Sequence, residues 1–100
     1  MWNHNYFVYI TTNSSKSTLY IGVTNDICTR LYQHKENKGT DKSFTVKYYC
    51  YYLVHYERFS HIEEAIAREK EINKWRREKK VALIESLNSG WRFLNNEVCD

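Results

Sequence analysis

The 100-residue chain contains no proline, only three glycines and no apolar run long enough to cross a membrane. A membrane-spanning helix needs about 20 apolar residues. Residues 1–5 show neither the cationic nor the apolar region of a secretory signal. The scarcity of chain breakers and of linker-like stretches predicts one domain over residues 1–100, with its core in about residues 6–94. We expect a cytoplasmic protein without membrane contact.

Cysteine is also scarce, since only Cys28, Cys50 and Cys99 are present. They form no CxxC pair, and an odd number leaves one thiol unpaired in any disulfide scheme. Reduced thiols and no disulfide are therefore expected, as is usual in a cytosol. The four histidines lack the spacing of a zinc site, so structural zinc is not expected.

Aromatic residues are abundant, at 16% of the chain, and nine residues are tyrosine. Charged residues make up 27% and the net charge is +3, a composition typical of folded domains. Between Arg68 and Lys80, seven cations and three carboxylates surround Trp75. This cluster favours a polyanion-binding surface. It is equally typical of a solvated helical surface with ion pairs between successive turns.

Residues 6–10 and 19–22 predict two strands of a β-hairpin, because aromatic and β-branched residues flank a polar, Ser-rich stretch. With a two-residue period, Tyr9 and Tyr20 would lie side by side on one sheet face. Gly22 beside them would let a backbone or a phosphate approach. Tyrosine is also a good structural strand residue, so the pair alone does not establish a site.

A first helix is predicted from Thr24 or Asn25, as the N-cap, to about Asn37. Arg30 and His34 lie one turn apart on it and are expected near the two tyrosines. A polar loop follows over residues 37–45. The aromatic run within residues 46–59 then predicts a third strand, expected in the middle of the sheet.

Ser60 and Glu63 form a capping-box pattern that opens a second helix, expected to end near residues 75–77. Its apolar stripe of Ile62, Ala65, Ile66 and Ile72 is interrupted by Glu69. A partly buried carboxylate needs a partner, which Arg30 or a divalent metal would supply, unless Glu69 reaches solvent at the edge of the stripe.

A third helix is expected at about residues 78–88, with Val81, Leu83, Ile84 and Leu87, and Trp91, Phe93 and Leu94 would close over the core. The order of elements predicts an α/β fold in which a three-stranded sheet, a β-hairpin plus a third strand, is flanked by three helices.

Several of these stretches together resemble a GIY-YIG nuclease domain. Val8-Tyr9 stands where the first motif ends, and Tyr20-Ile21-Gly22 reproduces the second. Residues 25–34 resemble the family's first helix, and residues 65–72 resemble its glutamate-bearing helix. Residues 75–91 resemble the end of short bacterial members that are UvrC-like or homing-endonuclease-like. The combined motif is specific although each piece is not.

The resemblance implies a metal-dependent endonuclease that hydrolyses DNA, in repair or recombination. It implies that Glu69 binds Mg²⁺ or Mn²⁺, that Tyr9 acts as a general base or orients water, and that His34 assists proton transfer. Tyr20 and Arg30 would contact the scissile phosphate. The residues expected to contact nucleic acid are Gly22, Arg68, Asn73, Lys74, Arg76 and Arg77.

Two departures from the family pattern keep alternatives open. Phe7 replaces the first motif's glycine, and Val23 stands where some members place a lysine near the phosphate. A nucleic-acid-binding module that has lost turnover is therefore the alternative to a nuclease, and a protein-interaction domain is a third. Nothing in the chain resembles a recognition helix or zinc finger, so we expect a preference for DNA structure or junctions, or little specificity, unless a partner or dimerisation adds it.

Overall fold

A computed structural model describes residues 5–36 and 50–99, with the side chains of residues 34–36 excluded. Three antiparallel strands form one sheet in the order β2-β1-β3. Their bounds are Tyr6–Thr12 for β1, Leu19–Thr24 for β2 and Tyr52–Phe59 for β3. The predicted hairpin is confirmed, and both of its strands run two residues further than the sequence indicated.

The expectation that the third strand occupies the middle of the sheet is wrong. β1 pairs with both other strands, and its last five residues are all buried. β3 begins at Tyr52 and lies at one edge, while the predicted residues 46–49 and the loop 37–45 lie outside the described residues. Near the start of β3, Tyr52 stacks on Phe93 and meets Tyr51 edge-on, so these rings pack at this end of the sheet and do not fill a central strand.

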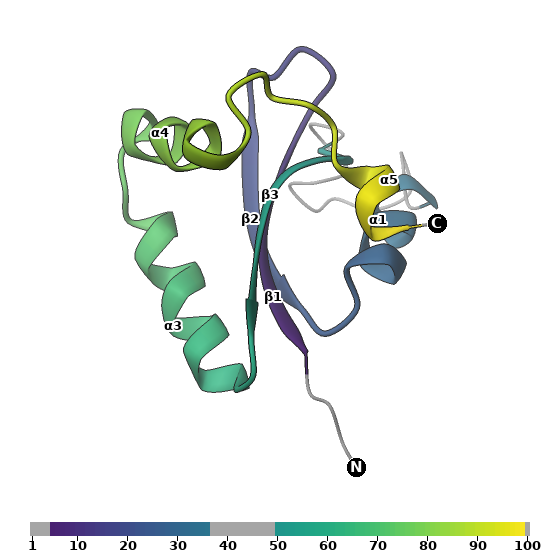
Figure 1. The fold of residues 1–100 in the computed structure, drawn as a ribbon, viewed down its shortest axis with the longest axis vertical. Coiled ribbons are helices and arrows are strands. Elements are labelled where there is room, and N and C mark those ends of the chain that lie inside the picture. The colour runs from purple at the N-terminus through teal and green to yellow at the C-terminus, as the bar shows by residue number, and fades with distance from the viewer. Residues whose placement is uncertain (1–4, 37–49, 100) are drawn as a thin grey trace.

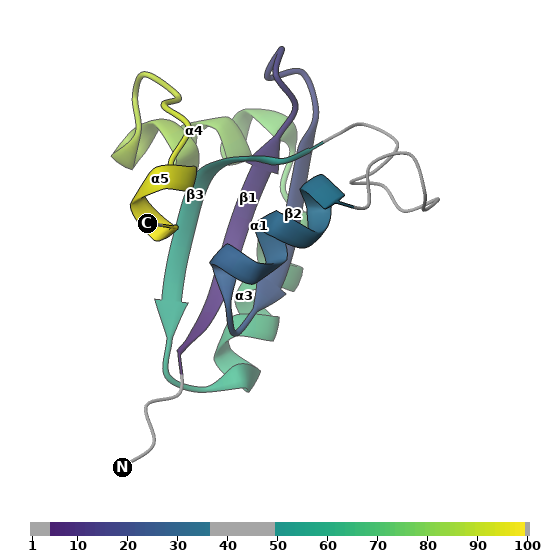
Figure 2. The same cartoon turned by 90° about the vertical axis from the view of Figure 1, so that its right-hand side faces the viewer.

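Helices cover both faces of the sheet. Figure 1 shows α3 and α4 on one side and α1 and α5 on the other, and Figure 2 shows the same layers from the α1 side. The helices span Ile27–Glu36 (α1), Ile62–Asn73 (α3), Arg77–Leu87 (α4) and Asn95–Val98 (α5). The α/β prediction is confirmed, with the short α5 as an addition that the sequence did not indicate. No described helix has the length and apolar character of a membrane span.

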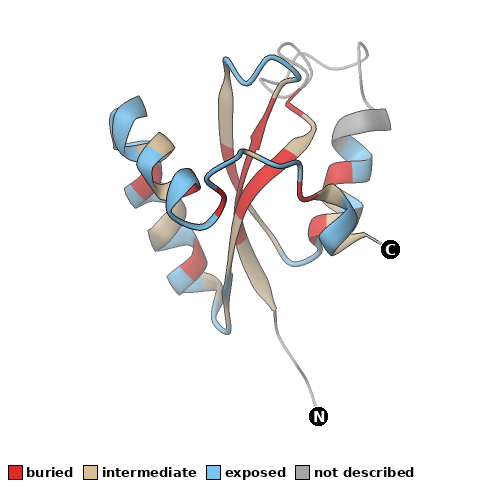
Figure 3. Cartoon of the chain, turned by 45° about the horizontal axis from the view of Figure 1, so that its top comes forward, coloured by how far each residue is buried: buried red, intermediate tan, exposed pale blue. Residues whose placement is uncertain are grey.

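The alternation of side chains along the strands produces two apolar layers, one on each face. The layer against α3 and α4 includes Val8, Ile10, Val54 and Ile84, and the layer against α1 and α5 includes Tyr9, Ile27, Leu31, Leu53 and Leu94. Figure 3 shows the buried residues concentrated along the strands and on the helix sides that face them. Successive residues of β1 therefore serve different layers, as a two-residue period requires.

The helix starts differ from the expected caps. Asp26, and neither Thr24 nor Asn25, caps α1, because its carboxylate accepts hydrogen bonds from the backbone N–H of Thr29 (3.1 Å) and from the Thr29 hydroxyl (2.8 Å). These bonds hold the pKa of Asp26 below its usual value. The expected capping box at Ser60 is wrong, since His61 is the N-cap of α3 and its side chain makes no capping hydrogen bond.

Three residues expected in the core are exposed. Ile66, Leu87 and Phe93 have exposed fractions of 39%, 77% and 41%. α3 buries only Ala65 and Ile72, because the stripe that faces the sheet is narrower than the sequence pattern indicated. Leu94, in contrast, is buried as expected.

The prediction that no disulfide forms is wrong. Cys28 in α1 is bonded to Cys99, just after α5, with 5.2 Å between the two Cα atoms. The bond joins segments 71 residues apart and fixes the chain end against the helix that carries Arg30. Cys50 remains a free buried thiol, and burial raises its pKa to about 11, which makes it a poor nucleophile.

Candidate functional site

The two predicted tyrosines share one face of the hairpin. Tyr9 pairs with Gly22 across the sheet and Thr11 with Tyr20, so the two rings are diagonal neighbours. Their centroids are 6.2 Å apart, and the ring planes are tilted by 47°. The expected arrangement of the two phenols on a common face is therefore confirmed.

Gly22 has a different role from the one expected. A Cβ at this position would lie 2.6 Å from the Tyr9 hydroxyl oxygen and 2.7 Å from Cζ of the same ring. The space above the glycine is thus filled by the Tyr9 phenol, and Gly22 is buried. The expectation that Gly22 lets a phosphate approach is wrong, because the glycine accommodates a side chain of its own sheet.

Arg30 of α1 completes what we call the tyrosine cluster, which consists of Tyr9, Tyr20, Gly22 and Arg30. The Arg30 side chain hydrogen-bonds Tyr9, which also interacts with Tyr20. Burial raises the pKa of Tyr9 and the neighbouring Tyr20 adds to the increase, while Arg30 lowers it by less. With an exposed fraction of 1%, Tyr9 is a buried neutral phenol.

One donor in this cluster has no acceptor. Nε of Arg30 is buried and makes no hydrogen bond among the residues that the structure describes. An unsatisfied buried donor costs about 1–3 kcal/mol, and more on a charged group. An anionic oxygen that entered the cluster would remove this cost.

Glu69 lies on the opposite side of the sheet. It stands between Ala65 and Ile72 on the side of α3 that faces the apolar layer, and it is half-buried, as the interruption of the stripe predicted. Its carboxylate accepts a hydrogen bond from the side-chain amide of Asn73, one turn further on. Within the described residues it makes no ion pair with Arg30, so this expected partner is ruled out.

A hollow of about 510 Å³ lies at the β2 edge of the sheet. It is lined by Leu19, Tyr20 and Ile21 of β2, by Asn73 of α3 and by Lys80 of α4. We call Glu69, Asn73 and Lys80 the edge group. Tyr20 and Asn73 each belong to one of the two groups, and both line this hollow, so β2 is where the groups approach each other.

The structure thus brings the predicted site residues together in two sets rather than one. Tyr9, Tyr20 and Arg30 form the first set, and Glu69 with Asn73 forms the second. His34 falls within α1, but its side chain lies outside the described part of the chain. Lys80 was not among the expected contacts, although it belongs to the basic cluster that the charge pattern indicated.

Arg68 is less suited to nucleic acid than its position in that cluster suggested. Its guanidinium binds both carboxylate oxygens of Glu57 (2.8 and 3.1 Å) and Glu71 (2.9 Å). His55, which is buried, hydrogen-bonds the same Glu57 at 2.8 Å. Burial alone would raise the pKa of Glu57, but the bonds from Arg68 and His55 outweigh it and lower the pKa. Arg68 therefore anchors α3 to β3.

The other expected cations differ in how free they are. Lys74 and Arg76 are exposed where α3 ends and α4 begins. Arg77 donates a hydrogen bond to the backbone carbonyl of Lys16 at the hairpin tip (3.1 Å). Lys79 places its ammonium 4.3 Å from the ring centroid of Trp75. Solvated cations and structurally engaged cations are therefore mixed in this cluster, and polyanion binding by the solvated ones stays a prediction.

The donor set at Glu69 fits a weakly held Mg²⁺ or Mn²⁺. No three His, Cys, Asp or Glu side chains gather as ligands among the described residues, so Glu69 would be the single carboxylate ligand. Mg²⁺ commonly binds through one or two carboxylates, several waters and the phosphates of a substrate. A half-buried carboxylate whose hydrogen-bond partner, Asn73, lines a hollow suits this mode, and it does not suit a closed structural site.

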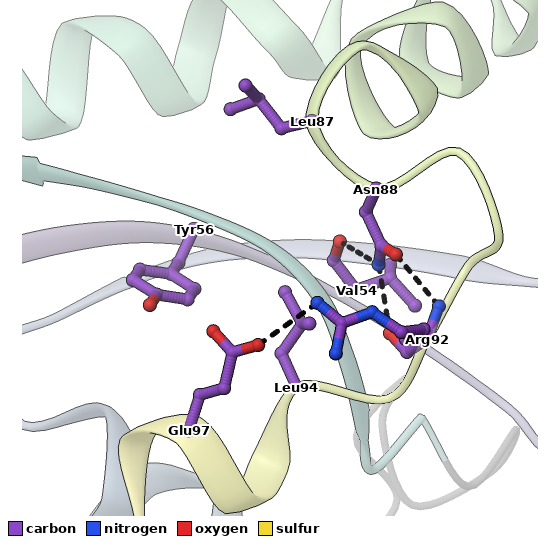
Figure 4. A pocket seen from close by; sticks show the side chains of 7 residues that line it. All are labelled: Val54, Tyr56, Leu87, Asn88, Arg92, Leu94 and Glu97. Carbon is purple, nitrogen blue, oxygen red and sulfur yellow. Dashed lines mark hydrogen bonds and ion pairs between the residues drawn. The ribbon is translucent and has the colours of Figure 1, made fainter.

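A second hollow, of about 280 Å³, lies beside β3 and is shown in Figure 4. Three of its polar side chains, those of Asn88, Arg92 and Glu97, are already engaged. Asn88 donates to the carbonyls of Val54 (3.1 Å) and Arg92 (2.9 Å), and the Arg92 guanidinium pairs with Glu97 at 3.3 Å. These contacts fix the segment after α4, so this hollow is a weaker candidate for a reaction than the one lined by Asn73 and Lys80.

Comparison with known proteins identifies the family of the chain. The GIY-YIG catalytic domain family matches residues 5–82. A UPF0213 protein from Haloquadratum walsbyi is 39% identical over 83 residues, which are 83% of this chain and 90% of that protein. A UPF0213 protein from Staphylococcus aureus strain Mu3 is 35% identical over 80 residues, 80% of this chain and 94% of the relative.

A solved structure supports the same assignment. The solution NMR structure of a UPF0213 protein from Bacillus halodurans superposes with a TM-score of 0.53 at 26% identity. The match covers 87% of this chain and 89% of that one. The chain belongs to the GIY-YIG catalytic domain family, and within it to the UPF0213 proteins.

Proposed function

We propose that the protein is a divalent-metal-dependent endonuclease that hydrolyses phosphodiester bonds in DNA, in repair or recombination. The observation that carries the proposal is the buried Nε of Arg30, which lacks an acceptor in a cluster that approaches the edge hollow. A phosphate oxygen is the acceptor that a guanidinium binds best. Membership of a family of catalytic domains supports the same conclusion.

Arg30 and Tyr20 would bind the scissile phosphate from the side of the tyrosine cluster. Lys80, which lines the same hollow, would add positive charge that Val23 does not supply. Charge-assisted hydrogen bonds of this kind stabilise the extra negative charge of the transition state. Lys74, Arg76 and Arg77 would contact the flanking backbone in a salt-dependent way.

Glu69, oriented by Asn73, would hold the metal, which stabilises charge on the leaving oxygen when bound. Of the two roles that the family resemblance implies for Tyr9, the raised pKa and full burial favour orientation over proton abstraction. Tyr9 would hold Arg30 and Tyr20 in position. His34 is retained as the proposed proton-transfer residue.

The test is a cleavage assay on labelled duplex, flap and single-stranded DNA with Mg²⁺ or Mn²⁺. Wild type is compared with Glu69→Gln and with Glu64→Gln, a matched change at an exposed glutamate of the same helix. Glu69→Gln should lower the rate by about 100-fold or more, since a metal ligand contributes several kcal/mol to the transition state. Equal rates in the three proteins, or undiminished cutting in EDTA, would contradict the proposal.

A second candidate function is a nucleic-acid-binding module without turnover. The observations that favour it are Val23 in place of a lysine and the inaccessibility of Tyr9. It predicts DNA binding that weakens with salt and no cutting with either metal. The same assay, run beside a binding measurement, separates the two functions.

A further inference from the structure

An aromatic stack stands at the end of the sheet where the β1–β2 hairpin turns. The ring of Phe93 lies on the ring of Tyr52, with centroids 4.3 Å apart and planes 22° from parallel. Tyr51 contacts Tyr52 edge-on at 5.2 Å. Phe93 has an exposed fraction of 41%, so a large apolar ring that is supported by the Tyr52 ring faces solvent.

The position of Phe93 is fixed by its neighbours and is not that of a loose tail. The backbone N–H of Leu94 donates to the carbonyl of Leu53 (2.7 Å). On the other side, Arg92 exchanges two hydrogen bonds with the buried side chain of Asn88, both at 2.9 Å (Figure 4). The exposed ring is therefore held in place by hydrogen bonds to the residues before and after it.

A cation is held beside this ring. Nζ of Lys16 lies 5.4 Å from the Phe93 centroid, and the hairpin tip and the segment between α4 and α5 lie at the same end of the sheet (Figures 1 and 2). Lys16 has a φ of 61°, a conformation that is costly for a residue with a Cβ. Strained residues of this kind cluster at functional sites.

The stack is also connected to the edge hollow. Lys80 lines the hollow, Arg77 stands one turn earlier on α4, and its guanidinium reaches the carbonyl of Lys16. A chain of phosphates that leaves the hollow along α4 would thus meet Lys80, Arg77 and Lys16 before it reaches Phe93. Proteins bind single-stranded nucleic acid with cationic side chains along the phosphates and aromatic rings on which the unpaired bases stack.

We propose that the stacked rings of Phe93 and Tyr52, with Lys16 beside them, bind an unpaired nucleobase of the nucleic acid whose backbone occupies the hollow between β2 and α4. This inference rests on the proposed function and gives its substrate class as DNA with a single-stranded segment next to a duplex. The base stacks on the outer face of Phe93. Lys16, on a long flexible side chain, moves from the ring to the adjoining phosphate.

The test measures binding by fluorescence anisotropy, in EDTA, of a blunt duplex and of the same duplex with a single-stranded tail. Phe93→Ala should weaken binding of the tailed DNA about tenfold and leave the blunt duplex unchanged, because one base–aromatic stack is lost. Phe93→Trp should bind the tailed DNA at least as tightly as wild type. Tyr32→Ala removes another exposed aromatic, on α1, and should change neither affinity.

A direct readout uses 2-aminopurine in the tail, whose fluorescence should fall on binding to wild type and Phe93→Trp but not to Phe93→Ala. Equal losses for tailed and blunt DNA, or tail binding unaffected by Phe93→Ala, would overturn the inference. If wild type and variants do not cut DNA in the metal-dependent cleavage assay but binding of the tailed DNA still depends on Phe93, the proposed cleavage fails and the base site stands. Cleavage by wild type without this dependence refutes the base site alone.

Discussion

The tyrosine cluster and the edge group are built differently, although both line the same edge strand. In the tyrosine cluster, Tyr9 fills the space over Gly22 and bonds Arg30, so the parts determine one another's positions. In the edge group, Glu69 is half-buried, and its carboxylate accepts a hydrogen bond from Asn73. The difference indicates that one side provides a rigid frame and the other an adaptable ligand.

Gly22→Ala should disturb the tyrosine cluster most. Its Cβ would lie 2.6 Å from the Tyr9 hydroxyl, so the ring or the strand must shift. Overpacking of this kind costs about 2–3 kcal/mol, and at about 4–8 °C per kcal/mol the melting temperature should fall by roughly 10–20 °C. A thermal melt followed by circular dichroism measures the change.

Two further variants test whether the effect of Gly22→Ala comes from the contact with Tyr9. Gly90→Ala is the matched control, because a Cβ there would meet nothing within 4 Å, and it should leave the melting temperature nearly unchanged. In a Tyr9→Ala background, Gly22→Ala should cost little, since the clashing ring is gone. Equal costs of Gly22→Ala in both backgrounds would show that Tyr9 is not the reason for the glycine.

A smaller effect is expected at Glu57, which anchors the helix that carries Glu69. Its folded-state pKa is lowered below the ordinary 4.5, so its stabilising contribution is present above about pH 4.5 and is lost as the pH falls through the folded value. Glu57→Gln should destabilise the protein by about 1–2 kcal/mol at pH 7. Urea titrations of both proteins across pH 3–7 should show the gap closing towards low pH, and a constant gap would refute the ion pair as its cause.

Substitutions in the tyrosine cluster and in the edge group should differ in their effect on stability. Tyr9→Phe removes a buried hydroxyl that bonds Arg30, and should cost about 1 kcal/mol of unfolding free energy. Glu69→Gln changes a half-exposed group and should stay within about 0.5 kcal/mol of wild type. Denaturant titrations decide the order, and a larger loss for Glu69→Gln would mean that the edge group, too, is part of the frame.

Much of this arrangement could be predicted, and the failures have physical causes. The period of two placed Phe7 with Tyr9 on one face of their strand and Tyr20 with Gly22 on one face of theirs, and the period of 3.6 placed Glu69 in an apolar stripe, because each pattern depends on neighbours along one element. The role of Gly22 depends on which side chain lies across the sheet. That side chain, Tyr9, is set by the β1–β2 register, which the sequence of a single strand does not reveal.

Contacts between residues far apart in the sequence account for the other predictions that were wrong. Cys28 and Cys99 are 71 residues apart, and α5 and the disulfide become visible only once the chain end packs on α1. Arg68 looked like a free cation until Glu57 of β3 was placed beside it. β3 seemed central because aromatic residues crowd its start, whereas the ring of Tyr52 stacks with Phe93 at one end of the sheet.

The central claim is that both groups act on one phosphate at the edge of β2. The most direct measurement is an NMR titration of the ¹⁵N-labelled protein with a short DNA duplex in EDTA, where metal-dependent cleavage is suppressed. The account predicts that signals from Tyr20 and Arg30 and from Glu69 and Asn73 shift together, with one dissociation constant. Shifts confined to one face of the sheet would contradict it.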